Sequence, residues 1–525
     1  MSAVLDSPEM TALRTLAEEA ARSTAEGIKR FVEPASGTLG RAKSRRHHLV
    51  FGRRGSGKTS LLMKAAHDLG QDHRPIAFVD LEPFKGHSYP DLLISVLIKS
   101  FTLFNESIEA ATERAGGRWS LRNLFGVLQP RGDGFDAKAG GELSKRIEDV
   151  TEKLKFQLRL ADGADLQRTT TQEEQSSAEG QLRSAVGVPS VGEASSAVGV
   201  SSGIRAGEEL REAFPRSKIE FLRQHVMEYG DILAQLSGLF RGSSYLFFDD
   251  LYFIPRRDQP RLLDYFHSIA KGNDAWLKIG TIRHRSQWYV HADPPTGLKL
   301  GDDTDEINLD LTLDSYALAK DFLSEVLNGL VEECSAPPIS DFLTTGAVDR
   351  LVLASGGVAR DFLGLFWRSM DEARERLQAN PAHHRGPRIG AEDVNLAAGG
   401  YGDMKLEEFR RDALEDQQRL EEAFGQVKEF CINAAQANCF LLDHDSAGDH
   451  TARIDELVDL RLLHLVRSRV TVPGRAGQVY RAYLLDLSQY TGSRARRGLE
   501  MLDFWRTGAR EQLRRISLIY DPSAE

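Results

Sequence analysis

The sequence is poor in cysteine, has no long apolar run and carries no excess of positive charge. Its three cysteines are Cys334, Cys431 and Cys439. They are too few for a disulfide framework and are not spaced as metal ligands, which favours a reducing, cytoplasmic location. No apolar run approaches the roughly 20 residues of a membrane-spanning helix, so we expect no membrane contact. With a formal net charge of −10, any contact with nucleic acid has to come from a local basic patch.

One glycine-rich stretch, residues 52–59, reads G-x-x-x-x-G-K-T. An apolar run of strand type, 48–51, precedes it, and a helical apolar pattern, 59–69, follows it. This strand, loop and helix order is the context of a phosphate-binding loop, in which backbone N–H groups and the helix N-terminus surround phosphates. Lys58 is expected to reach the β- and γ-phosphate oxygens and the Thr59 hydroxyl to hold Mg²⁺. The expected ATP-binding residues are Gly52, Arg53, Arg54, Gly55, Ser56, Gly57, Lys58, Thr59 and Ser60.

Four further runs of strand type alternate with helical patterns, at 74–82, 245–250, 275–281 and 306–311. With 48–51 they predict a five-stranded parallel sheet in a three-layer α/β core. The run 245–250 ends in Asp249 and Asp250. Carboxylates at a buried strand end are costly without a partner, so we expect Asp249 to bind Mg²⁺ and Asp250 to polarise the attacking water.

Two arginines are candidates for contact with the nucleotide phosphates. Arg283 follows the strand 275–281 and is expected beside the acids of the central strand, where it is a candidate catalytic residue; a solvated basic turn is the alternative. Residues 314–398 read as helices, and Arg360 falls in the first turn of one of them, after Gly356 and Gly357. A cation is unfavourable there unless an anion faces it, so Arg360 is expected to face phosphate, or else to form a structural salt bridge.

The alternation of strand-type and helical runs is interrupted between residues 126 and 215. Residues 161–207 are poor in large apolar side chains, whereas Phe156, Leu158 and Leu160 alternate with polar residues as in a strand. This insertion is either disordered or a projecting β-hairpin arm.

The C-terminal part, with a long polar helix at 404–440, a short helix at 454–465 and strands at 467–472 and 479–485, has the outline of a winged-helix module. It is rich in arginine within an acidic protein, so its expected partner is duplex DNA or, alternatively, the acidic surface of a neighbouring subunit. The arginines concerned are Arg461, Arg467, Arg469, Arg475, Arg481, Arg494, Arg496 and Arg497.

These motifs, taken in their order along the chain, resemble the AAA+ ATPases of the origin-recognition initiator group and, nearly as much, the STAND signalling ATPases. The resemblance implies that Lys58 and Thr59 belong to Walker A, that Asp249 and Asp250 form Walker B, and that Arg360 is sensor 2. Sensor 1 would be Thr281 or Arg283. It also implies assembly, in which an arginine of the next subunit completes the site, with Arg256, Arg257 and Arg285 as candidates.

Many AAA+ members carry Glu at the second Walker B position, and the shorter Asp250 suits a slow nucleotide switch. The expected function is an ATP-hydrolysing, DNA-binding AAA+ switch. The alternative is a STAND-like signalling ATPase whose winged helix packs on its own nucleotide domain, with His464 near the nucleotide and a protein as partner. The expected domains are an N-terminal helix with a basic lead-in (1–46), the ATPase core (47–312), a helical lid (313–400), and a winged-helix domain with a C-terminal helix (401–525).

Overall fold

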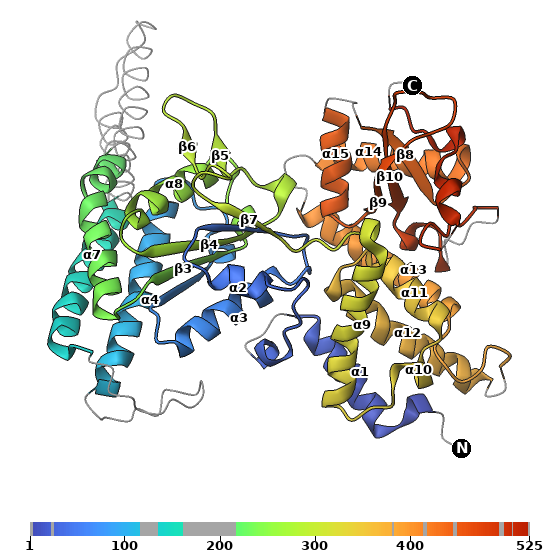
Figure 1. The fold of residues 1–525 in the computed structure, drawn as a ribbon, viewed down its shortest axis with the longest axis horizontal. Coiled ribbons are helices and arrows are strands. Elements are labelled where there is room, and N and C mark those ends of the chain that lie inside the picture. The colour runs from blue at the N-terminus through green and yellow to red at the C-terminus, as the bar shows by residue number, and fades with distance from the viewer. Residues whose placement is uncertain are drawn as a thin grey trace, which may run out of the picture.

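The computed structural model forms two lobes joined side by side (Figure 1). The structure describes residues 4–22, 26–115, 135–160, 217–380, 383–412, 417–444, 449–492, 498–506 and 508–522. The first lobe holds a five-stranded sheet, and the second holds a bundle of helices with a smaller sheet on it.

The sheet of the first lobe is entirely parallel, in the order β2-β3-β4-β1-β7. This confirms the predicted α/β core. Its strands are β1 (His48–Phe51), β2 (Ile76–Asp80), β3 (Ser244–Asp249), β4 (Ala275–Thr281) and β7 (Asp305–Asn308). A short ribbon of β5 (Tyr289–Val290) and β6 (Thr296–Gly297) lies beside it.

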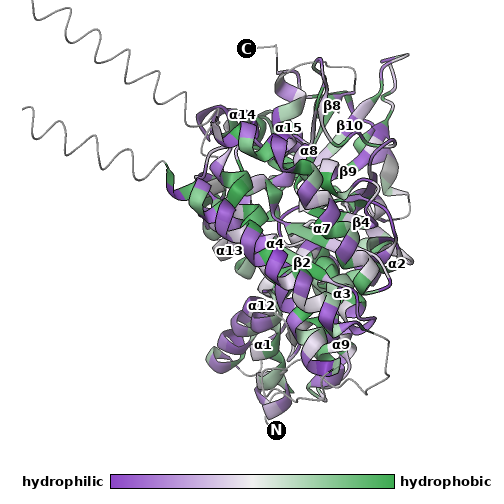
Figure 2. Ribbon diagram, turned by 90° about the vertical axis from the view of Figure 1, so that its left-hand side faces the viewer, coloured by the Kyte–Doolittle hydropathy of each residue, from purple (hydrophilic) through white to green (hydrophobic). Residues whose placement is uncertain are grey.

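Both faces of this sheet are covered because its central strand is apolar on both sides. In β3, Tyr245 and Phe247 enter one hydrophobic cluster, whereas Leu246 and Phe248 enter the other. The first face carries α2 (Thr38–Lys43) and α3 (Lys58–Gln71), and the second carries α4 (Asp91–Ala115), α7 (Val226–Leu239) and α8 (Gln259–Ala270). In Figure 2 the interior strands are mainly hydrophobic, whereas the helices around them show hydrophilic stretches.

The strand expected around Phe156, Leu158 and Leu160 is wrong, because residues 137–160 form one helix. Leu143, Ile147, Val150 and Leu154, three or four residues apart, bury one face of this helix in the core, and that spacing outweighs a short alternation at its end. After the insertion, a helix at 217–224 is followed by a turn at His225 and then by α7. The segment 161–207, for which a disordered insertion or an arm was expected, lies outside the described residues.

The second lobe is a helical bundle that also contains the beginning of the chain. It is built from α9 (Tyr316–Glu333), α10 (Ile339–Phe342), α11 (Thr345–Ser355), α12 (Ala359–Ala379) and α13 (Ala391–Asp412). The N-terminal helix α1 (Pro8–Ala20) packs on α9 and α12 through Leu13 and Ala17, and its Arg14 pairs with Asp371 at 2.8 Å. The N-terminal helix, expected as a unit with the basic lead-in, is therefore part of the lid. The chain then crosses to the sheet lobe through the 3-10 turn Glu26–Arg30.

The C-terminal module follows α13 as α14 (Gln417–Glu429), β8 (Cys439–Asp443), α15 (Asp449–Asp459), β9 (Leu463–Val470) and β10 (Tyr480–Leu485). Its antiparallel sheet has the order β8-β10-β9. The single helix expected at 404–440 is wrong, since α14 ends at Glu429 and a π-helical turn and β8 follow it before residue 440. The expected C-terminal helix is also absent among the described residues 498–506 and 508–522, whose helical segments are 3-10 turns.

No helix in the described part of the chain is both long and apolar enough to span a membrane.

Buried charges join the lid to the C-terminal module. Arg461, at a positive φ of 65° after α15, is 3% exposed and pairs with Asp361 of α12 and Glu408 of α13. Burial opposes ionisation of Asp361, yet Arg461 and Lys405 hold the pKa of this carboxyl below its usual value. Arg461 was expected to contact DNA; that expectation is wrong, because its guanidinium is enclosed and neutralised within the protein.

We predict that Arg461→Ala lowers the free energy of unfolding by about 3–5 kcal/mol, because it leaves Asp361 buried without its main counter-charge. Chemical denaturation measures this loss. Arg469→Ala, at an exposed position of β9, is the matched control and is expected to change stability by no more than about 0.5 kcal/mol. Equal losses of stability in the two variants would contradict the role of Arg461 as the buried counter-charge of Asp361.

Candidate nucleotide-binding site

The phosphate loop connects β1 to α3 in a conformation that glycine makes accessible. Gly55 and Gly57 have φ values of 83° and 95°, in the left-handed region that side chains disfavour. Gly57 lies directly before α3, which begins at Lys58. A side chain on Gly55 would bring its Cβ within 2.7 Å of the Arg360 Cβ. The loop therefore needs glycine both for its turn and for the close approach of the lid.

The structure brings the expected catalytic and metal-binding groups together at the carboxyl edge of the sheet. Lys58 is 5% exposed, and its ammonium donates to the carbonyls of Gly52 at 2.9 Å and Arg53 at 3.2 Å. The Thr59 side chain lowers the pKa of the Asp249 carboxylate, against the burial that raises it. Asp249 accepts from the backbone N–H of Asp250 at 3.0 Å.

Burial disfavours the charged forms of Lys58, Asp249 and Asp250. Burial and the neighbouring Asp249 raise the pKa of Asp250 to about 7. Burial also raises the pKa of Asp249, against the hydrogen bond from Thr59 and the charge of Lys58. The Lys58 ammonium has its pKa lowered by burial, although both carboxylates oppose this. A cation held by Asp249 and an anion held by Lys58 would each relieve part of this cost.

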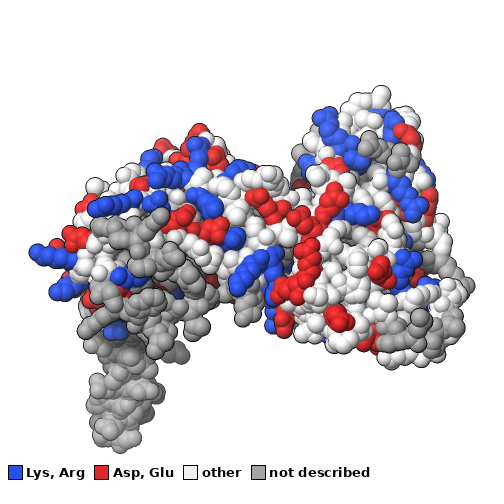
Figure 3. Space-filling model, turned by 60° about the horizontal axis from the view of Figure 1, so that its bottom comes forward, with Lys and Arg blue, Asp and Glu red and all other residues white. Residues whose placement is uncertain are grey.

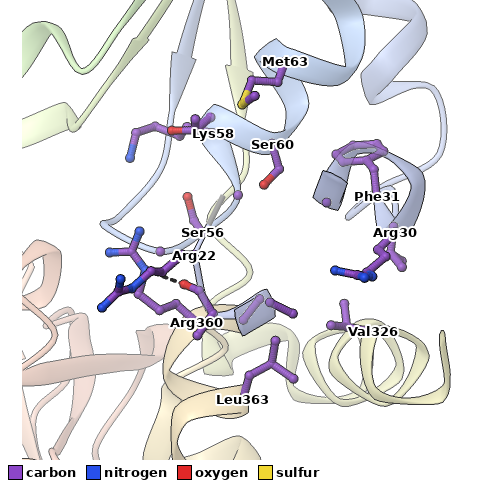
Figure 4. Close-up of a pocket in the computed structure, with 18 of the residues that line it drawn as sticks. Arg22, Arg30, Phe31, Ser56, Lys58, Ser60, Met63, Val326, Arg360 and Leu363 are labelled. Carbon is purple, nitrogen blue, oxygen red and sulfur yellow. Dashed lines mark hydrogen bonds between the residues drawn. The ribbon is translucent and has the colours of Figure 1, made fainter. Parts of the chain in front are cut away.

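A cavity of about 520 Å³ opens beside these groups and extends between the lobes. Figure 4 shows that its lining comes from the phosphate loop, the segment between α1 and α2, and the lid helices α9 and α12. The polar end holds residues 54–60 and Asp250, whereas apolar side chains gather at the other end beside the Arg30–Glu333 pair: Ile28, Phe31, Val326 and Leu363. Its size and its division into polar and apolar parts suit a nucleotide.

Arg360 lies where the sequence places it, at the start of α12 and against the phosphate loop. Its backbone N–H donates to the Gly55 carbonyl at 3.3 Å, and its guanidinium donates to the Ala21 carbonyl at 3.2 Å. It lines the cavity together with Arg22 (Figure 4).

Four other residues expected at the nucleotide do not line the cavity. Arg283 pairs with Glu306 and lies 4.1 Å from the centre of the Phe51 ring. Gly52 and Arg53 belong to the loop, but they are not among the residues that line the cavity, and the Arg53 side chain points toward the lid. Thr281, the other sensor 1 candidate, bonds to Ser286.

Several lining residues were not found from the sequence. Ile28 and Phe31 fall in a stretch that reads as an amphipathic helix, and Val326 and Leu363 fall in stretches that read as lid helices. Apolar periodicity marks such positions as buried, but it does not distinguish a core from the wall of a cavity.

The C-terminal module contacts the sheet lobe through α15. Arg256 donates to Glu456 of α15 at 3.1 Å, and the His284 ring lies 3.0 Å from Asp459. Arg285 lies 5.6 Å from the Tyr252 ring, and Arg257 is 80% exposed. Figure 3 shows acidic side chains along the junction of the lobes, with basic side chains beside them. Three arginines are candidates for completing the site of a neighbouring subunit. One of them, Arg256, instead forms an ion pair with Glu456 of its own chain.

The arginines expected to meet DNA divide into four groups. Arg467 and Arg481 pair with Asp314 and Asp455 at 3.3 and 3.4 Å. Arg469 and Arg475 are exposed on β9 and on the turn that follows it. Arg494, Arg496 and Arg497 lie outside the described residues. The remaining arginine, Arg461, is the buried one described above. His464, expected near the nucleotide in the STAND-like alternative, is buried against Asp486 at 2.8 Å and does not line the cavity.

The sheet order and the phosphate loop fit the core of a P-loop protein. No family model matches the chain, and no curated protein matches it. Among solved structures, the chain is similar to the ORC1 protein of Aeropyrum pernix in complex with DNA, at 16% identity and a TM-score of 0.31. The match covers 91% of this chain and 89% of that one.

We predict that Asp250→Asn stabilises the protein at pH 8 more than at pH 5.5. The folded pKa of about 7 lies above the ordinary value of 3.8, so between these values the folded state binds more protons and stability falls as pH rises. The slope is at most about 1.4 kcal/mol per pH unit, and the loss is complete above the folded pKa. Urea denaturation without nucleotide measures it, with the exposed Asp72→Asn as control. The prediction would be refuted if the gain in free energy of unfolding from Asp250→Asn were no larger at pH 8 than at pH 5.5.

Proposed function

We propose that the protein is an ATP-hydrolysing switch of the AAA+ class, which binds MgATP between the sheet lobe and the lid. The observation that carries this proposal is the single cavity lined by the phosphate loop, by Asp250 and by Arg360 of the lid. Phosphates at the polar end would meet the N-terminus of α3 and its unpaired backbone donors, which favour anions. The base would occupy the apolar end beside Phe31 and Val326.

The donor set beside the loop fits magnesium. Asp249 supplies a carboxylate and Thr59 a hydroxyl, and proteins commonly hold Mg²⁺ by one or two such oxygens together with phosphates and waters. The described residues contain no cluster of three or more His, Cys, Asp or Glu side chains that could hold a metal alone. Bound Mg²⁺ supplies positive charge to the β- and γ-phosphate oxygens.

Each remaining group has a role that its position supports. Lys58 neutralises phosphate charge, and Arg360 stabilises charge on the transferred phosphoryl group. Asp250 orients the attacking water and accepts its proton, which requires the ionised form. Because aspartate is short and its pKa is raised to about 7, we propose slow turnover, as a switch requires. Arg283, held by Glu306, links β4 to β7 in this proposal and does not act on phosphate.

Two partners are proposed for the C-terminal module, which we assign as a winged helix. The exposed Arg469 and Arg475, on the β9–β10 hairpin, favour duplex DNA bound through phosphates. The contacts of Glu456 and Asp459 with the sheet lobe favour the STAND-like alternative, in which this module packs on the nucleotide domain and the partner is a protein. Assembly into an oligomer would use Arg257, which is exposed, as the arginine acting in the next subunit.

Lys58→Ala and Asp250→Asn are predicted to lower ATP turnover by at least about a hundredfold each, because each removes a group that acts on the reacting phosphate or water. A phosphate-release assay with Mg²⁺ measures it. Arg360→Ala is expected to lower turnover, whereas Arg283→Ala is expected to leave most of it. Loss of turnover in Arg283→Ala alone would restore Arg283 as the sensor and contradict the role given to Arg360.

The double substitution Arg469→Gln and Arg475→Gln is predicted to weaken duplex DNA binding and to reduce the slope of log affinity against log salt by about 1.8, since each phosphate contact contributes about 0.9. Fluorescence anisotropy at several salt concentrations measures the slope. Arg45→Gln, exposed on the sheet lobe, is the control. Unchanged binding in the double variant would favour a protein partner for the module.

A further inference from the structure

Arg53 of the phosphate loop is directed away from the nucleotide cavity and into the junction of the lobes. It is 2% exposed. Its backbone N–H and its Nε donate to Asp310 at 2.8 and 3.1 Å. One Nη donates to the carbonyls of Leu311 at 3.1 Å and Gly356 at 3.0 Å. One side chain thus joins the loop to the end of β7, to the connection into the lid, and to the turn before α12.

The same turn is packed from its other side by the C-terminal module. A Cβ built on Gly356 would overlap the imidazole of His464 in β9. Gly356 therefore lies between Arg53 of the phosphate loop and His464, with no room for a side chain. Within the described part of the chain the His464 Nδ1 is buried and has no hydrogen-bond partner, so packing, not hydrogen bonding, sets its position against the turn.

His464 is fixed to the rest of the module. Its Nε2 lies 2.8 Å from Asp486, and Asp486 also accepts from Lys405 of α13 at 2.7 Å. Lys405 reaches back to the Ala354 carbonyl at 3.2 Å, just before the Gly356 turn. Further along β9, the Ser468 N–H donates to Asp314 of the connection into the lid at 3.1 Å. A shift of the turn at Gly356 is thus transmitted to β9 through contacts that are buried and closely packed.

We propose that Arg53 is a positioning residue that couples the phosphate loop to the C-terminal module through Gly356 and His464. This proposal rests on the nucleotide site proposed above. The Lys58 ammonium donates to the Arg53 carbonyl at 3.2 Å, and phosphates in the cavity would compete for that ammonium. Release of the carbonyl changes the loop at residue 53, and the Arg53 side chain carries the change to the lid turn and to β9. A bridge of this kind makes the module responsive to the nucleotide without any residue of the module lining the cavity.

Hydrogen–deuterium exchange of the full chain, with and without Mg²⁺-ADP, tests the coupling, and a fluorescent ADP analogue measures binding separately. In the wild type, amides of β9 at 463–470 are expected to change their exchange about tenfold when nucleotide binds. In Arg53→Gln this change is expected to vanish while nucleotide still binds and still protects α3. Arg53→Lys, which keeps the charge and one donor group, is expected to recover part of the change. A full response of β9 in Arg53→Gln, or no response in a wild type that binds ADP, would overturn the coupling.

Binding and coupling can fail separately. A wild type that binds no nucleotide would refute the proposed function, and the coupling is then judged from the nucleotide-free protein. There Arg53→Gln is expected to speed exchange at 463–466 about tenfold, although Arg53 makes no hydrogen bond to β9 among the described residues. Arg46→Gln, which removes an exposed pair with Asp305 on the sheet lobe, is the matched control. Equal exchange at 463–466 in both variants would overturn the coupling.

Discussion

A carboxylate and an ammonium are buried together at one edge of a parallel sheet, with a second, half-buried carboxylate beside them, and the rest of the structure is arranged around the cost of these charges. Parallel strands end at the same edge, so the loop after β1 and the acids after β3 lie close together although nearly 200 residues separate them in the chain. The strand between them, β4, carries Gly280, and any side chain there would displace Asp249. Buried charges of this kind are stabilised by partners, and Lys58 and Asp250 line the cavity in which we propose that MgATP binds.

The path of the chain explains how such a cavity can act beyond its own lobe. The chain begins in the lid, crosses to the sheet lobe between α1 and α2, and returns after β7 (Figure 1). Both crossings are next to the site, since residues 27–34 line the cavity and Asp310 holds Arg53. A ligand in the cavity therefore contacts both lobes at once. The binding free energy of such a ligand depends on the relative position of the two lobes. A ligand shifts a conformational equilibrium when it binds one conformation more tightly than another.

The sequence predicted most of the core, because each of its signals is local. A G-x-x-x-x-G-K-T loop, apolar runs ending in acids, and the helix after Gly357 depend on neighbours within a few residues. The cavity wall and the lid location of α1 depend on contacts between distant segments, which periodicity does not encode. Phe156, Leu158 and Leu160 show the opposite error: a five-residue alternation suggested a strand, although four buried positions upstream had already established a helix.

Charge is the property that the sequence described least well. Eight arginines against one acid within residues 460–498 suggested a basic face, but the acids that neutralise several of them come from outside this stretch. Asp361 and Asp314 belong to the lid and its connection, and Asp455 to α15, just before the basic stretch begins. Coulomb energy depends on distance in space, and an arginine enclosed with a carboxylate contributes almost nothing to the field outside. Of the described arginines in this stretch, Arg469 and Arg475 are the exposed ones, and both lie on the β9–β10 hairpin. A surface this small can add salt-dependent affinity for phosphates, but sequence selectivity would have to come from other groups, because phosphate contacts position a protein without reading bases.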